Sequence, residues 1–471
     1  MPSSSSDIRL ALPKGKLIAP TAALLDGIGL GFDGYSEGTR NYRMSSAHYP
    51  NVKAKLFQEK DIPVQVSVGN YDLGICGSDW IEELLAKYRH DNIIEVADLG
   101  YGRGRMQLVS SRRDDVSGVA DLPRRQCYIV SEYPNLAEAQ ALKLRLREFY
   151  IFPIWGAAEA YLPENANLAL VHSQASAPLS GELRSLRTLF ETSAVLIANK
   201  ESWRTKNMGW LLDRFSGRGL VPGSREAQPE EPPSASRTSE DEKARPADGL
   251  IWLALPDGHQ QQPTQELLRQ RGVEIAGYAE GSRRPTFPGA GIGVKVVRPQ
   301  DMPWHVANGR FDLAVSGQDW LRDHLCRFPA SPVVELADLG FGQVRIVAVL
   351  SQELPVTSMS ELGSLMKTGR LSPLRVASEY VNVADRYLQD HHIAPYRLIP
   401  TWGASEAFLP EDADLLIDNT QTGKTLAQHN LRIIDTLFTS SACLIGNKDS
   451  LASAAKADRM KRIMDIFRRS A

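Results

Sequence analysis

Short apolar runs alternate with amphipathic segments along the chain, and this alternation predicts strands followed by helices. The run IRLALP (8–13) precedes TAALLDGIGL (21–30), and LIWLALP (250–256) precedes TQELLRQRGV (264–273). In both places the second segment has helical spacing and ends near a glycine, which is a common helix C-terminus. Strands that alternate with helices in this way are typical of α/β folds with mainly parallel sheets.

Three further segments fit the same interpretation. The segment PVQVSVGNYDLGICG (63–77) predicts a helix, a turn and a buried strand. The segments CYIVSEYPN (127–135) and LRVASEYVN (374–382) each predict a strand that opens onto a helix. The predicted fold class is therefore α/β.

The chain contains the same pattern twice. Four pairs of matching segments carry the repeat, the first two pairs 240 residues apart and the last two 247 residues apart: DLGICGSDW (72–80) with DLAVSGQDW (312–320), DLGYGRGR (98–105) with DLGFGQVR (338–345), SEYPN (131–135) with SEYVN (378–382), and WGAAEAYLP (155–163) with WGASEAFLP (402–410). A repeat of this length indicates duplicated domains rather than a solenoid, whose repeats are about 20–50 residues long. Differences in function between the copies must come from the positions at which they differ.

A polar segment separates the two copies. Residues 217–248 are rich in Pro, Ser, Glu and Arg and poor in apolar side chains, so they predict a disordered linker. The predicted domains are a first module at 1–216 and a second module at 249–471. If the two modules pair within one chain, the linker raises their effective concentration and favours an intramolecular pseudo-dimer.

Composition narrows the classes of partner. The 471 residues are 42% hydrophobic and 23% charged, as in ordinary globular protein, and their net charge of −2 gives no overall positive field. We therefore expect neither nucleic acid nor membrane among the partners. Four cysteines without CxxC spacing suggest neither a zinc site nor a disulfide framework, and the metal ligands stay unknown. The N-terminal segment lacks the pattern of a signal peptide, so we expect a cytoplasmic protein.

The sharpest chemical signal is the segment DLLIDNTQTGKTL at 414–426. An apolar strand at 415–417 leads to Asp418, and a loop rich in threonine and glycine then precedes a predicted helix. Backbone N–H groups at a helix start attract anions, and three threonines, Thr420, Thr422 and Thr425, add hydroxyl donors. Gly423 lets the backbone approach a phosphate closely.

The type of anion follows from Asp418. A Walker P-loop requires a glycine five residues before Gly423, where this chain has Asp418, so that interpretation is rejected. A carboxylate beside phosphate donors suits a phosphorylated sugar, because the sugar hydroxyls need an acceptor. The alternative is a threonine-rich helix cap in which Asp418 is an ordinary turn residue.

The order of these motifs is specific. The segments ALPKGKL, DIP, DLGICG, DLGYGRGR and EYPN, with DNTQTGKTL in the second copy, resemble the ATP phosphoribosyltransferase family in both sequence and order. Each copy resembles the family's short catalytic form, which implies two α/β lobes around a cleft, as in type II periplasmic binding proteins. About one helix follows the second copy, so we expect no C-terminal regulatory domain of that family.

The resemblance implies a reaction. The family transfers phosphoribosyl from PRPP to N1 of ATP with release of pyrophosphate, in the presence of Mg²⁺. It implies a PRPP loop made of Asp418, Thr420, Gln421, Thr422, Gly423, Lys424 and Thr425, with Asp418, Arg345 and Arg40 as catalytic residues and Asp338, Glu379 and Arg283 on the acceptor side. Each role has a structural alternative: Asp338 caps a turn, or Arg345 pairs with a structural carboxylate.

The first copy lacks the loop's ligating features. Its aligned segment, NLALVHSQASAPL, has Val171, Ala175, Ser176 and Pro178 where the second copy has Asp418, Thr422, Gly423 and Thr425. Loss of about three charge-assisted hydrogen bonds would weaken PRPP binding by about 5–9 kcal/mol. We therefore expect the active site in the second module and a pseudo-catalytic first module.

The second copy has lost two lysines. It carries Asp257 and His259 where the first copy has Lys14 and Lys16. Either the first copy supplies the missing charge across a pseudo-dimer, with Arg40 as the crossing arginine, or the acceptor is another N-heterocycle without a triphosphate, which we favour slightly. Lys14 and Lys16 are then relics, an effector site or solvated surface.

Two other functions stay open for the whole chain: a non-catalytic regulatory or ligand-binding homologue, and a structural partner of another subunit. Further homo-oligomers of the chain also stay open.

Overall fold

The computed structural model describes residues 7–39, 42–46, 48–87, 92–114, 116, 118–124, 126–174, 179–216, 250–369 and 371–468. The predicted linker at 217–248 lies outside the described residues, as do Arg40 and the segment 175–178. The predicted module boundaries therefore stay predictions. Among the helices of the described ranges, none is both long and apolar enough to cross a membrane.

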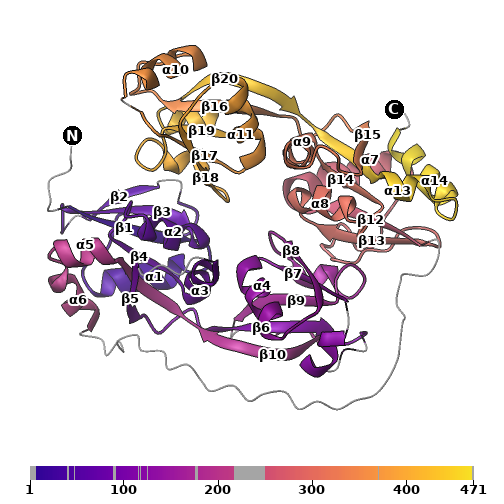
Figure 1. The fold of residues 1–471 in the computed structure, drawn as a ribbon, viewed down its shortest axis with the longest axis horizontal. Helices are drawn as coiled ribbons and strands as arrows, with labels where there is room; N and C mark the ends of the chain where they lie inside the picture. Colours follow the sequence, from indigo (N-terminus) through magenta and orange to yellow (C-terminus); the bar gives the residue numbers. More distant parts are fainter. Residues whose placement is uncertain are drawn as a thin grey trace. The chain divides into compact units, whose positions relative to one another are not determined.

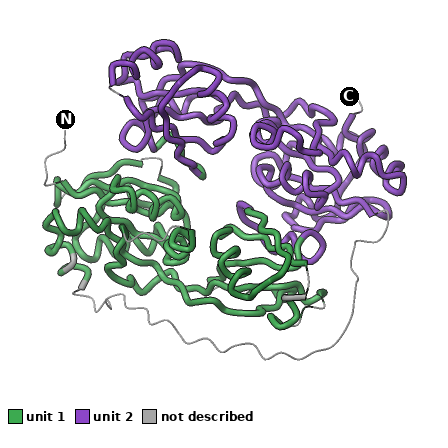
Figure 2. Tube along the Cα trace, in the orientation of Figure 1, with its two compact units in different colours: residues 1–153, 166–238, 402–407 green, residues 154–165, 239–401, 408–471 purple. Residues whose placement is uncertain are grey.

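The chain divides into two compact units, each made mainly of one sequence copy (Figure 2). Unit 1 contains residues 1–153, 166–238 and 402–407. Unit 2 contains residues 154–165, 239–401 and 408–471. Each unit therefore includes a short segment from the other copy.

Unit 1 has two sheets (Figure 1). The first has the strand order β2 (Arg43–Ser45), β3 (Val52–Gln58), β1 (Ile8–Lys14), β4 (Leu73–Gly77), β11 (Ala194–Asn199), β5 (Ile93–Asp98). The second has the order β10 (Leu183–Thr192), β6 (Gly104–Ser111), β9 (Leu168–Gln174), β7 (Gln126–Ser131), β8 (Glu148–Pro153). Each sheet packs against its own cluster of buried apolar side chains.

Unit 2 repeats this topology. Its first sheet has the order β13 (Ile292–Val297), β12 (Ile251–Pro256), β14 (Leu313–Gly317), β21 (Ala442–Asn447), β15 (Val333–Asp338). Its second has the order β18 (Tyr396–Pro400), β17 (Leu374–Ser378), β19 (Leu415–Thr420), β16 (Val344–Ser351), β20 (Leu431–Ser440). Apart from the edge strand β2, the strand orders of the two units correspond one to one, which agrees with the duplication seen in the sequence.

Helices connect the strands. In the first copy they are α1 (Ile18–Gly27), α2 (Ile62–Ser67), α3 (Ser78–Lys87), α4 (Pro134–Lys143), α5 (Lys200–Thr205) and α6 (Gly209–Ser216). In the second copy they are α7 (Gln261–Gln270), α8 (Met302–Ala307), α9 (Gln318–Arg327), α10 (Met359–Lys367), α11 (Val381–Asp390), α12 (Lys424–Gln428), α13 (Lys448–Ala452) and α14 (Ala457–Arg468). The strand–helix pairs expected near 8–30, 63–77, 127–135, 250–273 and 374–382 are confirmed.

The expectation of mainly parallel sheets is wrong, because all four sheets are mixed. In unit 2, β12 pairs in parallel with β13 and β14, whereas β21 pairs antiparallel with both β14 and β15. The chain leaves the first sheet after β15 and returns from the second sheet at β21. The returning strand enters between β14 and β15 and runs against them, a path that local hydrophobic patterns do not reveal.

The aspartates that open the motifs DLGICG and DLAVSG are structural. Asp312 is 2% exposed, and its Oδ2 accepts a hydrogen bond of 2.8 Å from the backbone N–H of Trp252. Its Oδ1 lies 2.7 Å from the Lys456 Nζ. Asp72 makes the equivalent ion pair with Lys206 at 2.8 Å. These buried carboxylates join neighbouring elements of the first sheet in each unit, since burial of a charge requires such partners.

The segment 154–165, which comes from the first copy, is bonded to unit 2. The Trp155 backbone N–H donates to Asp301 Oδ2 at 3.1 Å, and the Tyr161 hydroxyl donates to the same oxygen at 3.3 Å. Tyr161 is fully buried, and burial followed by the nearby Asp301 charge raises the pKa of its hydroxyl. The segment therefore belongs to the packed interior of unit 2.

An ion-pair cluster anchors the end of this segment. Glu164 Oε2 lies 2.6 Å from the Nζ of Lys295, whose side chain is 1% exposed, and Glu164 Oε1 lies 3.1 Å from Arg284 Nη1. Burial lowers the pKa of Lys295 to about 8, and the Glu164 charge opposes that shift. A residue of the first copy thus compensates a buried charge of the second.

The segment 402–407, from the second copy, packs into unit 1. The Tyr42 hydroxyl donates to Glu406 Oε1 at 3.3 Å, and the Lys60 Nζ lies 4.7 Å from the centre of the Trp402 ring. Each copy therefore contributes a segment that contains its WGA motif to the unit built mainly from the other copy.

Candidate functional site

The candidate site begins on β19 in the second copy. The strand continues to Thr420, three residues beyond its predicted end. The side chains at 415–417 are fully buried, whereas Asp418 is half-buried. Asp418 is therefore held on a strand whose preceding residues are fixed in the core, rather than on a free loop.

The turn after β19 is ordered by its own threonines. The Thr420 Oγ1 accepts a hydrogen bond from the Gly423 N–H at 3.0 Å, and the Thr422 Oγ1 accepts one from the Lys424 N–H at 3.4 Å. Gly423 has a φ of +73°, the left-handed region that favours glycine, and α12 begins at the next residue. The loop side chains Gln421, Thr422, Lys424 and Thr425 are exposed.

The turn keeps its hydroxyl protons available. A threonine hydroxyl has one donor and two acceptor positions, so an oxygen that accepts a backbone N–H can still donate its own proton. The hydroxyls of Thr420 and Thr422 are used as acceptors inside the turn. Their O–H groups therefore suit an acceptor outside it, such as a phosphate oxygen.

Arg345 lies beside this turn. It sits on β16, directly opposite Thr420 of β19 and Thr439 of β20 in regular antiparallel pairs. Residues directly opposite in an antiparallel pair project from the same face of the sheet. The structure thus brings Arg345, Asp418 and the threonine turn together on the second sheet of unit 2.

A hydrogen-bond chain that the sequence analysis missed supports Asp418. The Asn419 Nδ2 donates to the Tyr380 hydroxyl at 3.0 Å, and that hydroxyl donates to Asp319 Oδ2 at 2.7 Å. Asp418 Oδ1 in turn accepts from the Asn419 backbone N–H at 2.7 Å. Tyr380 is 1% exposed, and burial followed by the Asp319 charge raises its pKa well above the usual value. The repeated motifs SEYVN and GQDW contained the signal, since they hold Tyr380 and Asp319.

The first copy keeps only part of this chain. The Tyr133 hydroxyl donates to Asp79 Oδ2 at 2.5 Å, which matches the Tyr380 bond. His172 occupies the position of Asn419, however, and its Nε2 bonds Thr192 Oγ1 at 2.7 Å instead. Val171 of β9, which lies opposite Gln107 of β6, occupies the position of Asp418. The other predicted departures, at 175–178, lie outside the described residues.

Asp338 closes a turn, as its structural alternative expects, and its acceptor-side role stays a prediction. Its Oδ1 accepts from the Gly340 N–H at 2.9 Å and from the Ser441 hydroxyl at 2.5 Å. These bonds close the turn after β15 and link it to the residue before β21. Glu379 is half-buried between β17 and α11, next to Tyr380.

The charges at Asp257 and Arg283 compensate each other. Arg283 Nη1 lies 2.8 Å from Asp257 Oδ2, and the two side chains are 39% and 19% exposed. The carboxylate that replaces Lys14 of the first copy is therefore not an isolated negative charge. In unit 1, Lys14 Nζ instead donates to the Tyr42 hydroxyl at 3.4 Å.

Metal binding by side chains alone is not indicated. Within the described ranges, no group of three or more His, Cys, Asp or Glu side chains is placed to hold a metal ion. Mg²⁺ commonly keeps several waters and binds through substrate phosphates with only one or two carboxylates.

Comparison with known proteins shows which families this chain is similar to. A family model described as ATP phosphoribosyltransferase (HisG) matches residues 58–217 and 298–469. The ATP phosphoribosyltransferase of Moorella thermoacetica is 32% identical over 226 residues, which cover 47% of this chain and 93% of that protein. The solved HisG:HisZ ATP phosphoribosyl transferase complex of Thermotoga maritima is 23% identical, with a TM-score of 0.37, and covers 46% of this chain and 96% of that chain.

Periplasmic binding proteins are also similar. The aliphatic sulphonate binding protein SsuA of Escherichia coli is 16% identical, with a TM-score of 0.29, over 45% of this chain and 68% of that chain. The predicted fold class, two tandem modules that each contain two α/β lobes, is confirmed by the two α/β sheets of each unit and by the family model that matches twice. Because the family model matches both copies and together covers more than half of the sequence, the chain belongs to the ATP phosphoribosyltransferase family.

Proposed function

We propose that the second copy is a PRPP-dependent phosphoribosyltransferase site and that the first copy is its pseudo-catalytic partner. The observation that carries the proposal is the complete threonine turn after β19, with Asp418 before it and Arg345 opposite Thr420. The first copy has Val171 in place of Asp418 and His172 in place of Asn419. Among the described residues, only the second copy therefore combines a carboxylate with an ordered set of phosphate donors.

The chemistry requires positioning more than proton transfer. A neutral ring nitrogen attacks C1 of the ribose, and pyrophosphate leaves with the bonding electrons. On this proposal Asp418 accepts hydrogen bonds from the ribose hydroxyls, and the hydroxyls and backbone N–H groups of the turn hold the 5-phosphate. Such fixed donors lower the barrier by orienting the reactants and stabilising charge. Mg²⁺ would accompany the diphosphate of PRPP and neutralise part of its charge.

The Asp257–Arg283 pair bears on the acceptor. The pair is neutral overall, and Asp257 and His259 stand where the first copy has two cations, Lys14 and Lys16. A triphosphate gains less from a neutral pair than from two free cations. We therefore favour an N-heterocyclic acceptor that lacks a triphosphate, with ATP as the alternative.

Product analysis with a panel of acceptors tests this proposal. The full chain is incubated with PRPP, Mg²⁺ and, in separate reactions, ATP, adenosine, adenine and free azoles, and both pyrophosphate and the mass of the product are measured. We expect pyrophosphate release and a product heavier than the acceptor by one phosphoribosyl group. A rate with ATP more than about tenfold above every other acceptor would disprove the changed acceptor, and no turnover with any acceptor would count against the enzyme itself.

The hydrogen-bond chain behind Asp418 gives a second test. Tyr380→Phe removes the hydroxyl that bonds both Asn419 and Asp319. We expect kcat/KM for PRPP to fall about tenfold and the free energy of unfolding to fall by about 1–3 kcal/mol, because two polar groups lose their partner. Steady-state kinetics and thermal unfolding measure the two effects.

The first copy supplies the matched control for this variant. Tyr133→Phe removes the equivalent bond to Asp79 but lies behind His172 rather than Asn419. It should lower stability to a similar extent and leave kcat/KM unchanged. If both variants reduce kcat/KM equally, the effect is a general loss of stability and the positioning role of Tyr380 is wrong.

A further inference from the structure

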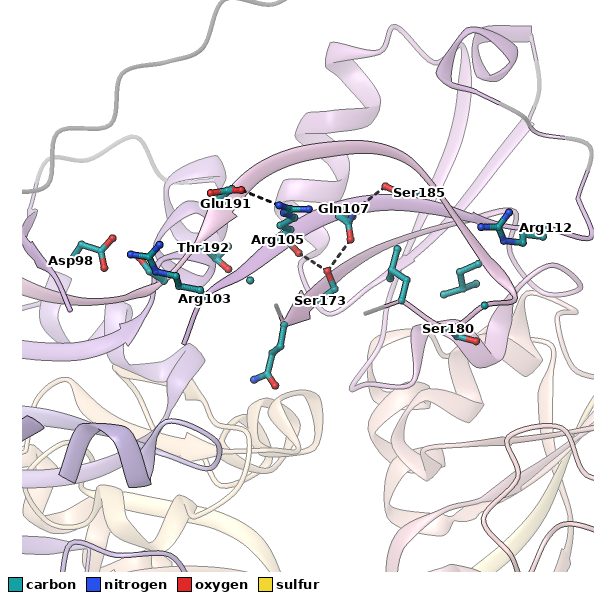
Figure 3. A pocket seen from close by; sticks show the side chains of 16 residues that line it. Asp98, Arg103, Arg105, Gln107, Arg112, Ser173, Ser180, Ser185, Glu191 and Thr192 are labelled. Carbon is teal, nitrogen blue, oxygen red and sulfur yellow. Dashed lines mark hydrogen bonds and ion pairs between the residues drawn. The ribbon is translucent and has the colours of Figure 1, made fainter. Parts of the chain in front are cut away.

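Unit 1 contains a cavity of about 800 Å³ against β6, β9 and β10 (Figure 3). Its lining includes Arg103, Arg105, Gln107, Ser173 and Ser185. Its volume is within the range of small-molecule sites, about 300–1,000 Å³. The cavity occupies the position in the first copy that corresponds to the turn after β19, since Ser173 aligns with Thr420 of the second copy. Loss of the PRPP loop has therefore not closed the site.

The floor of this cavity is a polar cluster that the second copy lacks. The Gln107 Nε2 donates to Ser185 Oγ at 2.9 Å and to Thr188 Oγ1 at 3.2 Å, and the Ser173 hydroxyl donates to Gln107 Oε1 at 2.8 Å. Figure 3 shows Gln107 between Ser173 and Ser185. In the second copy, Val347 and Ile433 replace Gln107 and Ser185. Three strands of the first copy thus carry polar residues that satisfy one another.

A second matched change lies at the end of β6. A Cβ atom at Gly104 would lie only 2.4 Å from the His172 Nε2, so the histidine fits because this position is glycine. The second copy has Val344 and Asn419 at the same two positions. Loss of function alone gives no reason for coordinated changes on separate strands. The residues at these paired positions therefore fit one another within each copy.

Charged side chains of both signs line one end of the cavity, near the start of β6. Arg103 replaces Gln343 of the second copy, and its side chain has no hydrogen-bond or ion-pair partner in the part of the chain that the structure describes. Arg105 lies 3.4 Å from Glu191, but both side chains are more than half exposed, so this pair is weak. Asp98 adds a carboxylate at the same end (Figure 3).

We propose that this cavity binds a small sugar phosphate without transferring it, and so acts as a ligand site in the first copy. The guanidinium of Arg103, with that of Arg105, would hold the phosphate, since a planar guanidinium matches phosphate geometry. Asp98 and the hydroxyls of Ser173 and Ser185 would bond the sugar hydroxyls. Phosphate recognition thus moves from the turn backbone used in the second copy to arginine side chains. The inference does not depend on catalysis by the second copy.

Isothermal titration calorimetry tests the proposal with ribose 5-phosphate, ribose and inorganic phosphate as separate probes. The full chain carries Asp418→Val and Thr422→Ala, which remove the second-copy turn as a competing site. We expect one ribose 5-phosphate per chain, bound at least tenfold more tightly than either ribose or phosphate. Absence of binding overturns the proposal, and so does equal binding of phosphate alone, which would mean a simple anion site.

Variants taken from the second copy locate the ligand. Arg103→Gln and Gln107→Val each give the first copy the residue type that the second copy has at the aligned position, Gln343 and Val347. Each substitution should weaken ribose 5-phosphate binding at least fivefold. An unchanged melting temperature shows that the variant chain stays folded. Arg113→Gln is the charge-matched control, because Arg113 pairs with Glu182 outside the lining. Equal affinity in Arg103→Gln and Arg113→Gln would refute the assignment. Pyrophosphate release by the unmodified chain is scored separately, so failure of the proposed enzyme and failure of this site are distinguishable.

Discussion

Replacing Asp418 with valine is expected to lower pyrophosphate release from PRPP at least about a hundredfold. Valine is the residue of the first copy at this position, Val171, so the change is compatible with the fold. The substitution removes the carboxylate that would accept the ribose hydroxyls, and two charge-assisted hydrogen bonds contribute about 3–6 kcal/mol. A continuous pyrophosphate assay at saturating acceptor measures the effect.

The reciprocal substitution is the control. Val171→Asp restores one carboxylate in the first copy but neither Thr422 nor Gly423 of the second-copy turn, so the rate should stay unchanged. If Asp418→Val retains more than about a tenth of the rate, or if Val171→Asp raises it substantially, the assignment of the active site to the second copy is wrong.

Among the substitutions considered, removal of Glu164 is expected to lower the free energy of unfolding most. Glu164→Ala leaves the Lys295 ammonium buried without its carboxylate partner at 2.6 Å. Breaking such a pair costs about 3–5 kcal/mol, and we expect about 3 because a quarter of the Glu164 side chain is exposed. In a unit of this size that corresponds to a fall in melting temperature of about 6–12 °C. Calorimetry of the full chain resolves the transition of unit 2.

The loss should depend on pH. Burial lowers the pKa of Lys295 to about 8 and Glu164 opposes this shift, so removal of Glu164 lowers that pKa further. A lysine with a folded pKa below its unfolded value destabilises the folded state at low pH, and stability is regained as the pH rises through that window. The difference between Glu164→Ala and the unmodified chain should therefore be largest at low pH, shrink as the pH rises toward about 8, and stay constant above that value.

An exposed acid in the same segment provides the comparison. Glu159 lies five residues before Glu164 and is exposed, so Glu159→Ala should change stability by less than about 0.5 kcal/mol. Similar effects of the two variants would contradict the packing of segment 154–165 into unit 2.

The sequence predicted the elements better than their connections. Apolar runs gave the strand–helix pairs near 8–30 and 250–273, because a buried strand and an amphipathic helix each leave a local pattern. The antiparallel return of β21 between β14 and β15 depends on contacts more than 100 residues apart, which no local pattern records. The exchange of segments 154–165 and 402–407 between units was hidden for the same reason.

The candidate site was predicted in part. The turn from Asp418 to Thr425 was visible because its residue types act locally, whereas the support from Tyr380 and Asp319 requires two other elements to meet it. Asp257, which replaces a lysine of the first copy, has its charge compensated by Arg283 at 2.8 Å, a partner 26 residues away that no local pattern indicates. Arg40, the predicted crossing arginine, lies outside the described residues and stays a prediction.

A crystal structure of the full chain with PRPP and Mg²⁺ tests the central claim most directly. The account predicts PRPP in unit 2, with its ribose hydroxyls on Asp418 and its 5-phosphate on the turn that includes Thr420 and Thr422. PRPP bound in unit 1 alone, or in neither unit, would contradict it.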